Sequence, residues 1–128
     1  MSDERRLNLP PALDRLLQQA VAEIVNLAHP QAVILFGSHA EGKARPDSDF
    51  DLVVIARTNN RRRLSARIHL LWHHLSRALP DLPPADILVY TPRQFEDNML
   101  VGFVAHEAAN FGVVLYGQIP AGSQAMAS

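Results

Sequence analysis

The sequence contains no cysteine among its 128 residues. Without cysteine, disulfide bonds, catalysis by a thiolate and zinc sites with cysteine ligands are all excluded. Long apolar runs are also absent, and none approaches the roughly 20 residues that a helix needs to span a bilayer. The charged N-terminal segment, residues 1–6, is not followed by the apolar core of a signal peptide. We therefore expect a soluble cytoplasmic domain that does not enter a membrane.

An excess of charge of either sign is likewise missing. Lys and Arg number 12 and Asp and Glu number 13, giving a net charge of -1, which excludes a strongly cationic protein that coats nucleic acids. The alternation of basic and aromatic residues found in single-strand binders is not present either. The composition, 48% hydrophobic and 20% charged, is that of an ordinary globular domain. The sequence therefore predicts one folded domain and gives no strong signal for nucleic-acid binding.

The spacing of apolar residues predicts an α/β domain. Three segments with apolar residues every three or four positions are predicted helices: 10–29, 60–79 and 93–110. Four short apolar segments are predicted strands: 32–36, 50–56, 85–90 and 113–116. We assign residues 1–117 to the domain and expect the small, polar tail 118–128 to be disordered.

Two aspartates stand at the head of the second predicted strand. Asp49 and Asp51 are separated by Phe50, and strand side chains alternate between faces, so the two carboxylates are expected to point the same way. Parallel carboxylates repel each other unless a cation lies between them. Oxygen ligands of this kind suit Mg²⁺, which takes its remaining ligands from water and phosphates. An Asp-x-Asp pair also occurs on solvated loops, so the pair alone leaves both interpretations open.

The segment upstream of the aspartates favours the metal interpretation. Gly37 and Ser38 follow a buried strand, where glycine permits close approach of a phosphate and free N–H groups and a hydroxyl can bind its oxygens. Lys43 and Arg45 add cations to the connection, although either could simply be solvated. A phosphate-binding turn at one strand end beside a carboxylate pair on the next strand is the layout of metal-assisted phosphoryl or nucleotidyl transfer.

The segment from Gly37 to Asp51 resembles a known family signature. Gly37-Ser38, ten residues, then Asp49-Phe50-Asp51 is similar to the G-S-x10-D-x-D motif of the DNA polymerase β-like nucleotidyltransferases, and more narrowly to their minimal nucleotidyltransferase group. Agreement extends to further residues of the motif and its flanks: Ala40, Gly42, Arg45, Pro46, Asp47, Ser48 and Leu52. The resemblance implies a polymerase β-like palm, in which helices pack on a small mixed sheet. His39 and Glu41 depart from the family pattern.

The resemblance also implies a set of site residues. Asp86, at the start of a later strand, would complete the site as a third carboxylate, with a turn aspartate as the less favoured alternative. Two Mg²⁺ ions would bind to the catalytic carboxylates Asp49, Asp51 and Asp86. The ATP substrate would bind to a second set of residues, which are Gly37, Ser38, Lys43, Arg45 and Ser48.

The function implied by the resemblance is transfer of AMP from ATP to a hydroxyl. Small members of the group pair with a HEPN-domain ribonuclease toxin, so the resemblance implies an antitoxin that AMPylates such a toxin. Two alternatives stay open: nucleotidyl transfer to a small-molecule hydroxyl, and a non-catalytic module that only binds its partner.

Other polar residues are interpreted as surface. His69, His73 and His74 lie on one predicted helix, but no third zinc ligand accompanies them, so a polar helix edge is the simpler interpretation. The basic cluster 61–63 is interpreted as a solvated face, with docking of RNA or a protein as the alternative. His39 is expected on a mobile connection that does not face the aspartates.

Overall fold

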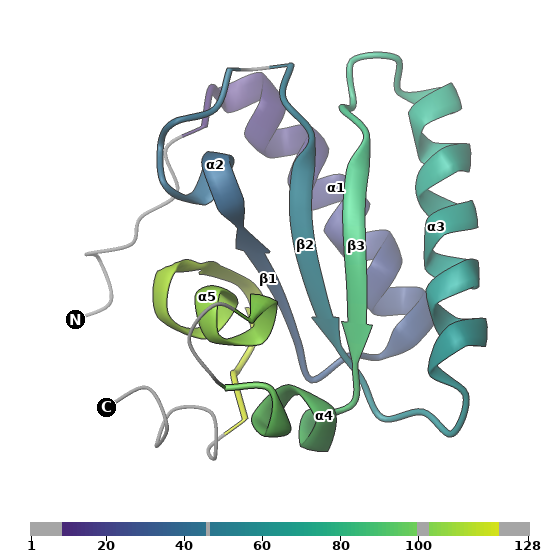
Figure 1. Ribbon diagram of the computed structural model, residues 1–128. Helices are drawn as coiled ribbons and strands as arrows, with labels where there is room; N and C mark the ends of the chain where they lie inside the picture. Colours follow the sequence, from purple (N-terminus) through teal and green to yellow (C-terminus); the bar gives the residue numbers. More distant parts are fainter. Residues whose placement is uncertain (1–8, 46, 100–102, 121–128) are drawn as a thin grey trace.

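The computed structural model describes residues 9–45, 47–99 and 103–120, which form a four-stranded mixed sheet flanked by helices (Figure 1). The strand order is β3-β2-β1-β4, with β2 parallel to β3 and β1 antiparallel to both β2 and β4. The strands are β1 (Ala32–Phe36), β2 (Phe50–Ile55), β3 (Ala85–Tyr90) and β4 (Val113–Gly117). All four predicted strands, and the mixed sheet implied by the family resemblance, are confirmed.

Two long helices begin and end where the sequence predicts. The helices are α1 (Pro11–Ala28), α2 (Gly37–Ala40), α3 (Arg61–Ala78), α4 (Pro92–Asp97) and α5 (Val104–Phe111). Proline is tolerated in the first turn of α1, because the N–H that it lacks has no partner there. The Asn60 side chain caps α3 by accepting the Arg63 N–H at 3.0 Å. No helix in the described part of the chain is both long and apolar enough to cross a membrane.

The prediction of a single helix over 93–110 is wrong. The structure has two helices, α4 and α5, with residues 100–102 outside the described part of the chain. Asn98 ends α4: its N–H bonds to the Phe95 carbonyl at 3.2 Å and its Nδ2 donates to the Gln94 carbonyl at 2.7 Å. Asparagine competes in this way with helical hydrogen bonding. The spacing of apolar residues alone does not reveal this competition.

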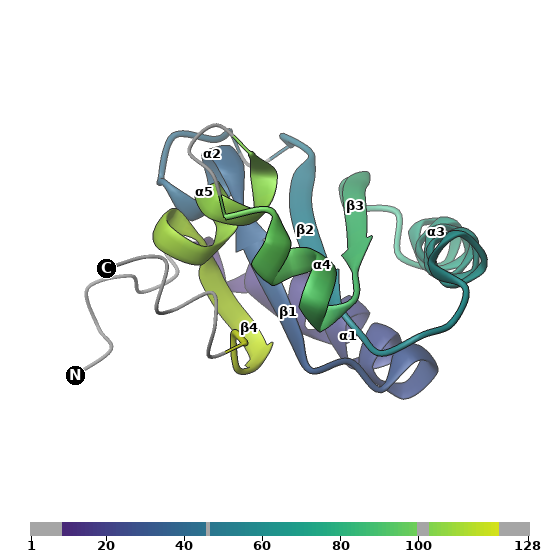
Figure 2. The ribbon, with the colours of Figure 1, turned by 60° about the horizontal axis from the view of Figure 1, so that its bottom comes forward.

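The sheet is covered on both faces. In Figures 1 and 2, α1 lies against one face and α4 and α5 lie against the other, while α3 runs along β3. Side chains alternate between the two cores along each strand: in β2, Leu52 and Val54 pack against α1 and α3, and Val53 and Ile55 pack on the side of α4 and α5. Burying each such side chain contributes roughly 1.5–3 kcal/mol to stability.

Contacts continue past the predicted domain boundary at residue 117. The Gln118 N–H donates to the Gln31 carbonyl at 3.1 Å, and Ile119 packs against the core on the side of α4 and α5. The sequence assigns residues 118–120 to the tail, but in the structure they pack against the domain. Residues 121–128 of that tail lie outside the described part of the chain.

Trp72 connects α3 to the turn that leads into β3. Its indole is 4% exposed, and Nε1 donates to the Pro83 carbonyl at 3.0 Å. Replacing Trp72 with Phe would keep an aromatic ring but leave this buried carbonyl without its donor. We expect Trp72→Phe to lower the free energy of unfolding by about 1–3 kcal/mol, measured by urea denaturation. A variant as stable as the parent would show that the carbonyl is satisfied in another way.

Candidate active site

Strand pairing brings the predicted carboxylates to one end of the sheet. Asp51 lies opposite Phe36 in β1 and opposite Asp86 in β3. Residues opposite each other in neighbouring strands point to the same face, so Asp51 and Asp86 share the face covered further along by α4 and α5. Asp49 directly precedes β2. Asp49 and Asp86 are exposed and Asp51 is half-buried, which leaves all three accessible to a ligand.

Gly37 is more than an ordinary turn glycine. Its φ is 74°, a left-handed conformation that side chains disfavour. A Cβ at this position would overlap the Asp51 carboxylate and approach its Cγ to 3.1 Å. Because Gly37 has no side chain, the Asp51 carboxylate can occupy the space beside it. This contact joins the predicted phosphate-binding turn to the predicted carboxylate site.

The remaining predicted nucleotide-binding residues lie on α2 and on the loop after it. Ser38 is half-buried in α2, and its carbonyl accepts the Lys43 N–H at 2.9 Å. The Ser48 hydroxyl accepts the Arg45 N–H at 3.1 Å and so connects Arg45 to Ser48. The Lys43 ammonium forms an exposed ion pair with Glu41 at 3.3 Å. Contact of these side chains with a nucleotide stays a prediction.

His39 differs from the sequence expectation. Rather than lying on a mobile connection, it is part of α2 and only 5% exposed. Its Nε2 lies 2.8 Å from the Ser48 carbonyl, and its ring centroid is 4.7 Å from that of Phe50. A histidine directly after Ser38 gave no sign of burial, because the short α2 has no apolar periodicity from which an inward face could be recognised.

The carboxylates influence each other electrostatically. The pKa of Asp51 is raised from its ordinary value, first by burial and then by the negative charges of Asp86 and Asp49, while His39 acts in the opposite direction. Such a cluster is suited to a divalent cation, which would relieve the repulsion, and carboxylate oxygens are ligands that Mg²⁺ accepts. Within the described residues, no three acidic or histidine side chains form a preassembled metal site.

Comparison with known proteins identifies the family. The family model of the nucleotidyltransferase domain matches residues 15–115. The chain belongs to this nucleotidyltransferase family. The match includes Gly37, Ser38 and all three aspartates, and it confirms the family expected from the motif. No curated protein sequence matches the chain significantly.

Several solved structures have the same fold. A toxin–antitoxin complex with AMP-PNP is 16% identical, with a TM-score of 0.53, over 86% of this chain and 80% of that chain. A protein from Sulfolobus solfataricus described as a nucleotidyltransferase is 17% identical, with a TM-score of 0.52, over 84% and 82%. The toxin–antitoxin pair MntA–HepT is 16% identical, with a TM-score of 0.50, over 88% and 80%. These similarities confirm the polymerase β-like fold.

Gly37 and Gly42 together provide a matched test of the Asp51 contact. Both have positive φ, 74° and 73°, but a Cβ at Gly42 would meet nothing within 4 Å. Alanine at either position should cost about 1–2 kcal/mol of stability from backbone strain. Only Gly37→Ala should also displace the Asp51 carboxylate and remove nucleotidyl transfer, whereas Gly42→Ala should stay within a few fold of the parent. Equal activity of the two variants would contradict the contact.

The raised pKa of Asp51 leads to a prediction about how the stability of the fold depends on pH. A carboxyl whose pKa is higher in the folded state favours folding when it is protonated, so its ionisation costs stability as the pH rises through that pKa. In chelator at neutral pH, Asp51→Asn should therefore melt at or above the temperature of the parent, and this advantage should disappear in acid. Addition of Mg²⁺ and ATP should raise the melting temperature of the parent alone. A variant less stable in chelator would show that the ionised carboxylate is stabilising.

Proposed function

We propose that this nucleotidyltransferase transfers AMP from ATP to a hydroxyl group of a HEPN-domain toxin, and that it thereby acts as the antitoxin of a toxin–antitoxin pair. Nucleotidyl transfer follows from the family. ATP as the donor, Mg²⁺ as the cation and the toxin as the acceptor are the finer assignments proposed here.

The observation that best supports this chemistry is the contact of the Asp51 carboxylate with the side-chain-free Gly37. It puts a carboxylate against the first residue of α2, where Ser38 is predicted to bind phosphate. Asp86 lies opposite Asp51 in the neighbouring strand. A nucleotide on the α2 turn and an acceptor hydroxyl beside Asp86 would consequently be adjacent, and this proximity is what group transfer requires.

Binding of the triphosphate is assigned to α2 and the loop after it. Backbone N–H groups near Gly37 and the Ser38 hydroxyl would donate hydrogen bonds to phosphate oxygens. Lys43 and Arg45, both exposed, would neutralise phosphate charge. Ser48 would act mainly by shaping the loop, since its hydroxyl already accepts the Arg45 N–H.

The three aspartates are assigned to the reaction itself. Asp49, Asp51 and Asp86 would bind two Mg²⁺ ions, which when bound lower the pKa of the acceptor hydroxyl and neutralise the leaving pyrophosphate. The acceptor oxygen forms a bond to the α-phosphorus of ATP, and the bond from that phosphorus to the α,β-bridging oxygen breaks. Pyrophosphate leaves, and Asp86 accepts the proton of the hydroxyl.

The partner is proposed from the similarity of fold. Two structures that share this fold are toxin–antitoxin complexes, one of them with AMP-PNP. At 16% identity these similarities establish the fold alone, and the toxin as acceptor is part of the proposal.

Asp86→Asn separates catalysis from binding. We expect this variant to bind ATP but to transfer AMP about 10²–10⁴-fold more slowly, as for loss of a general base. The assay incubates the protein with Mg²⁺, labelled ATP and a HEPN-domain protein as the candidate acceptor, and reads the intact mass of both chains. Asp97→Asn is the control, because Asp97 is exposed at the end of α4 and should leave the rate unchanged.

This assay, together with a test of toxin neutralisation in cells, distinguishes the alternatives. One AMP added to the partner by the parent, and lost with Asp86→Asn, supports the proposal. If AMP were found only on a small-molecule hydroxyl, that small molecule would be the acceptor in place of the toxin. Neutralisation of the partner by Asp86→Asn to the level of the parent would show that contact is sufficient, and the enzymatic antitoxin would be wrong.

A further inference from the structure

We propose that His39 is a positioning residue. It would fix the distance between the predicted phosphate-binding turn at Gly37 and Ser38 and the loop that carries Asp49. The inference rests on the proposed function for its catalytic consequence, but its structural part stands on contacts of the described residues. His39 directly follows Ser38, and the residue that it contacts, Ser48, directly precedes Asp49. One side chain therefore connects the two halves of the motif at the residues next to their functional positions.

The hydrogen bond indicates which nitrogen of the imidazole carries a hydrogen. Nε2 lies 2.8 Å from the Ser48 carbonyl oxygen, which can only accept. Nε2 must therefore carry the hydrogen and donate it. A donor at this point satisfies a loop carbonyl and restrains the backbone from which the Asp49 side chain extends.

A second contact fixes the plane of the ring. The His39 and Phe50 centroids are 4.7 Å apart with planes inclined at 46°, and Phe50 meets Trp72 edge-on at 6.3 Å. Phe50 lies between Asp49 and Asp51 in sequence and is fully buried. The imidazole thus contacts the backbone before Asp49 and the side chain after it.

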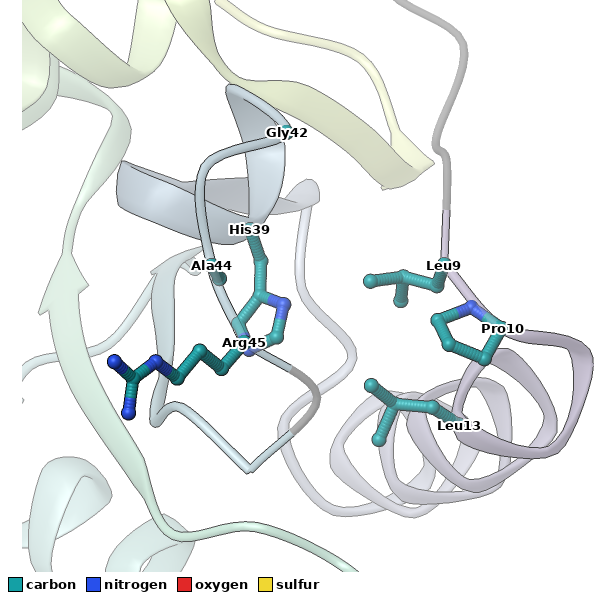
Figure 3. Close-up of a pocket in the computed structure, with 7 residues that line it drawn as sticks. All are labelled: Leu9, Pro10, Leu13, His39, Gly42, Ala44 and Arg45. Carbon is teal, nitrogen blue, oxygen red and sulfur yellow. The ribbon is translucent and has the colours of Figure 1, made fainter.

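The opposite side of His39 gives much less support. A pocket of about 190 Å³ lies between His39 and the start of α1, where Leu9, Pro10 and Leu13 line it. Figure 3 shows these three side chains across the pocket from the imidazole, with the Arg45 side chain directed away from them. The pocket therefore separates part of the start of α1 from the ring. Its orientation depends on the Ser48 hydrogen bond and on Phe50.

This arrangement predicts a defect in metal use rather than in folding. Loss of the donor would release the loop carrying Asp49 while the sheet and its two cores remain. Removing a residue that orients a metal ligand commonly costs about 10- to 100-fold in metal affinity or activity. We expect this factor in the Mg²⁺ concentration for half-maximal transfer and in kcat, with the KM for the acceptor little changed.

Two substitutions distinguish the effect of losing the hydrogen-bond donor from the effect of changing the side-chain volume. His39→Leu has similar bulk and no donor, whereas His39→Gln can offer an amide N–H close to the position of Nε2. His73→Leu is the control, because His73 is exposed on α3. Melting temperature, hydrogen exchange of the Ser48 and Phe50 amides, and the Mg²⁺ dependence of AMP transfer are measured for each variant.

The expected result is a folded His39→Leu protein whose Ser48 amide exchanges faster and whose Mg²⁺ requirement is raised about 10-fold or more, with both effects largely restored in His39→Gln and absent in His73→Leu. Unchanged exchange and Mg²⁺ dependence in His39→Leu would overturn the proposal, as would a His39→Gln variant no better than His39→Leu. If the parent transfers no AMP, the proposed function fails, and the exchange rates still decide whether His39 restrains the loop.

Discussion

Burial of Phe50 is the constraint on which the site depends. This side chain is fully buried in the core beneath α1 and α3, and strand alternation then directs Asp51 to the other face of the sheet. The same ring contacts His39 on one side and Trp72 on the other, and Trp72 in turn bonds to the Pro83 carbonyl just before β3. A continuous row of buried groups thus underlies the three chain segments that carry the predicted phosphate-binding turn and the carboxylates.

The site conflicts electrostatically with the core that supports it. Asp51 is half-buried beside two further carboxylates, so the pKa of Asp51 rises and its ionisation is disfavoured. Cross-strand pairing nevertheless fixes Asp51 opposite Asp86, and the backbone cannot separate them without losing ladder hydrogen bonds. Such local conflicts with an otherwise consistent fold are typical of functional positions. A bound cation, as proposed for this site, would remove the repulsion.

The sequence predicted the strands, the two long helices and the family, because each depends on local signals such as apolar runs, proline, the Asn60 cap and the spacing of the motif. It failed where a single polar side chain overrides periodicity, as at Asn98, which ends α4. It also failed for His39, whose burial results from a partner nine residues away across a loop. The occupation of the space above Gly37 by Asp51 could not be predicted either, since that contact requires the register of β1 with β2.

That contact has a consequence in genetic terms. Every base change in a glycine codon that alters the residue introduces a Cβ, and at Gly37 any Cβ meets both a left-handed backbone and the Asp51 carboxylate. At Gly42 the same change meets only the backbone conformation. Two glycines five positions apart, with nearly equal φ, are thus unequal targets for mutation: one tolerates change at the cost of stability, and the other has no conservative replacement.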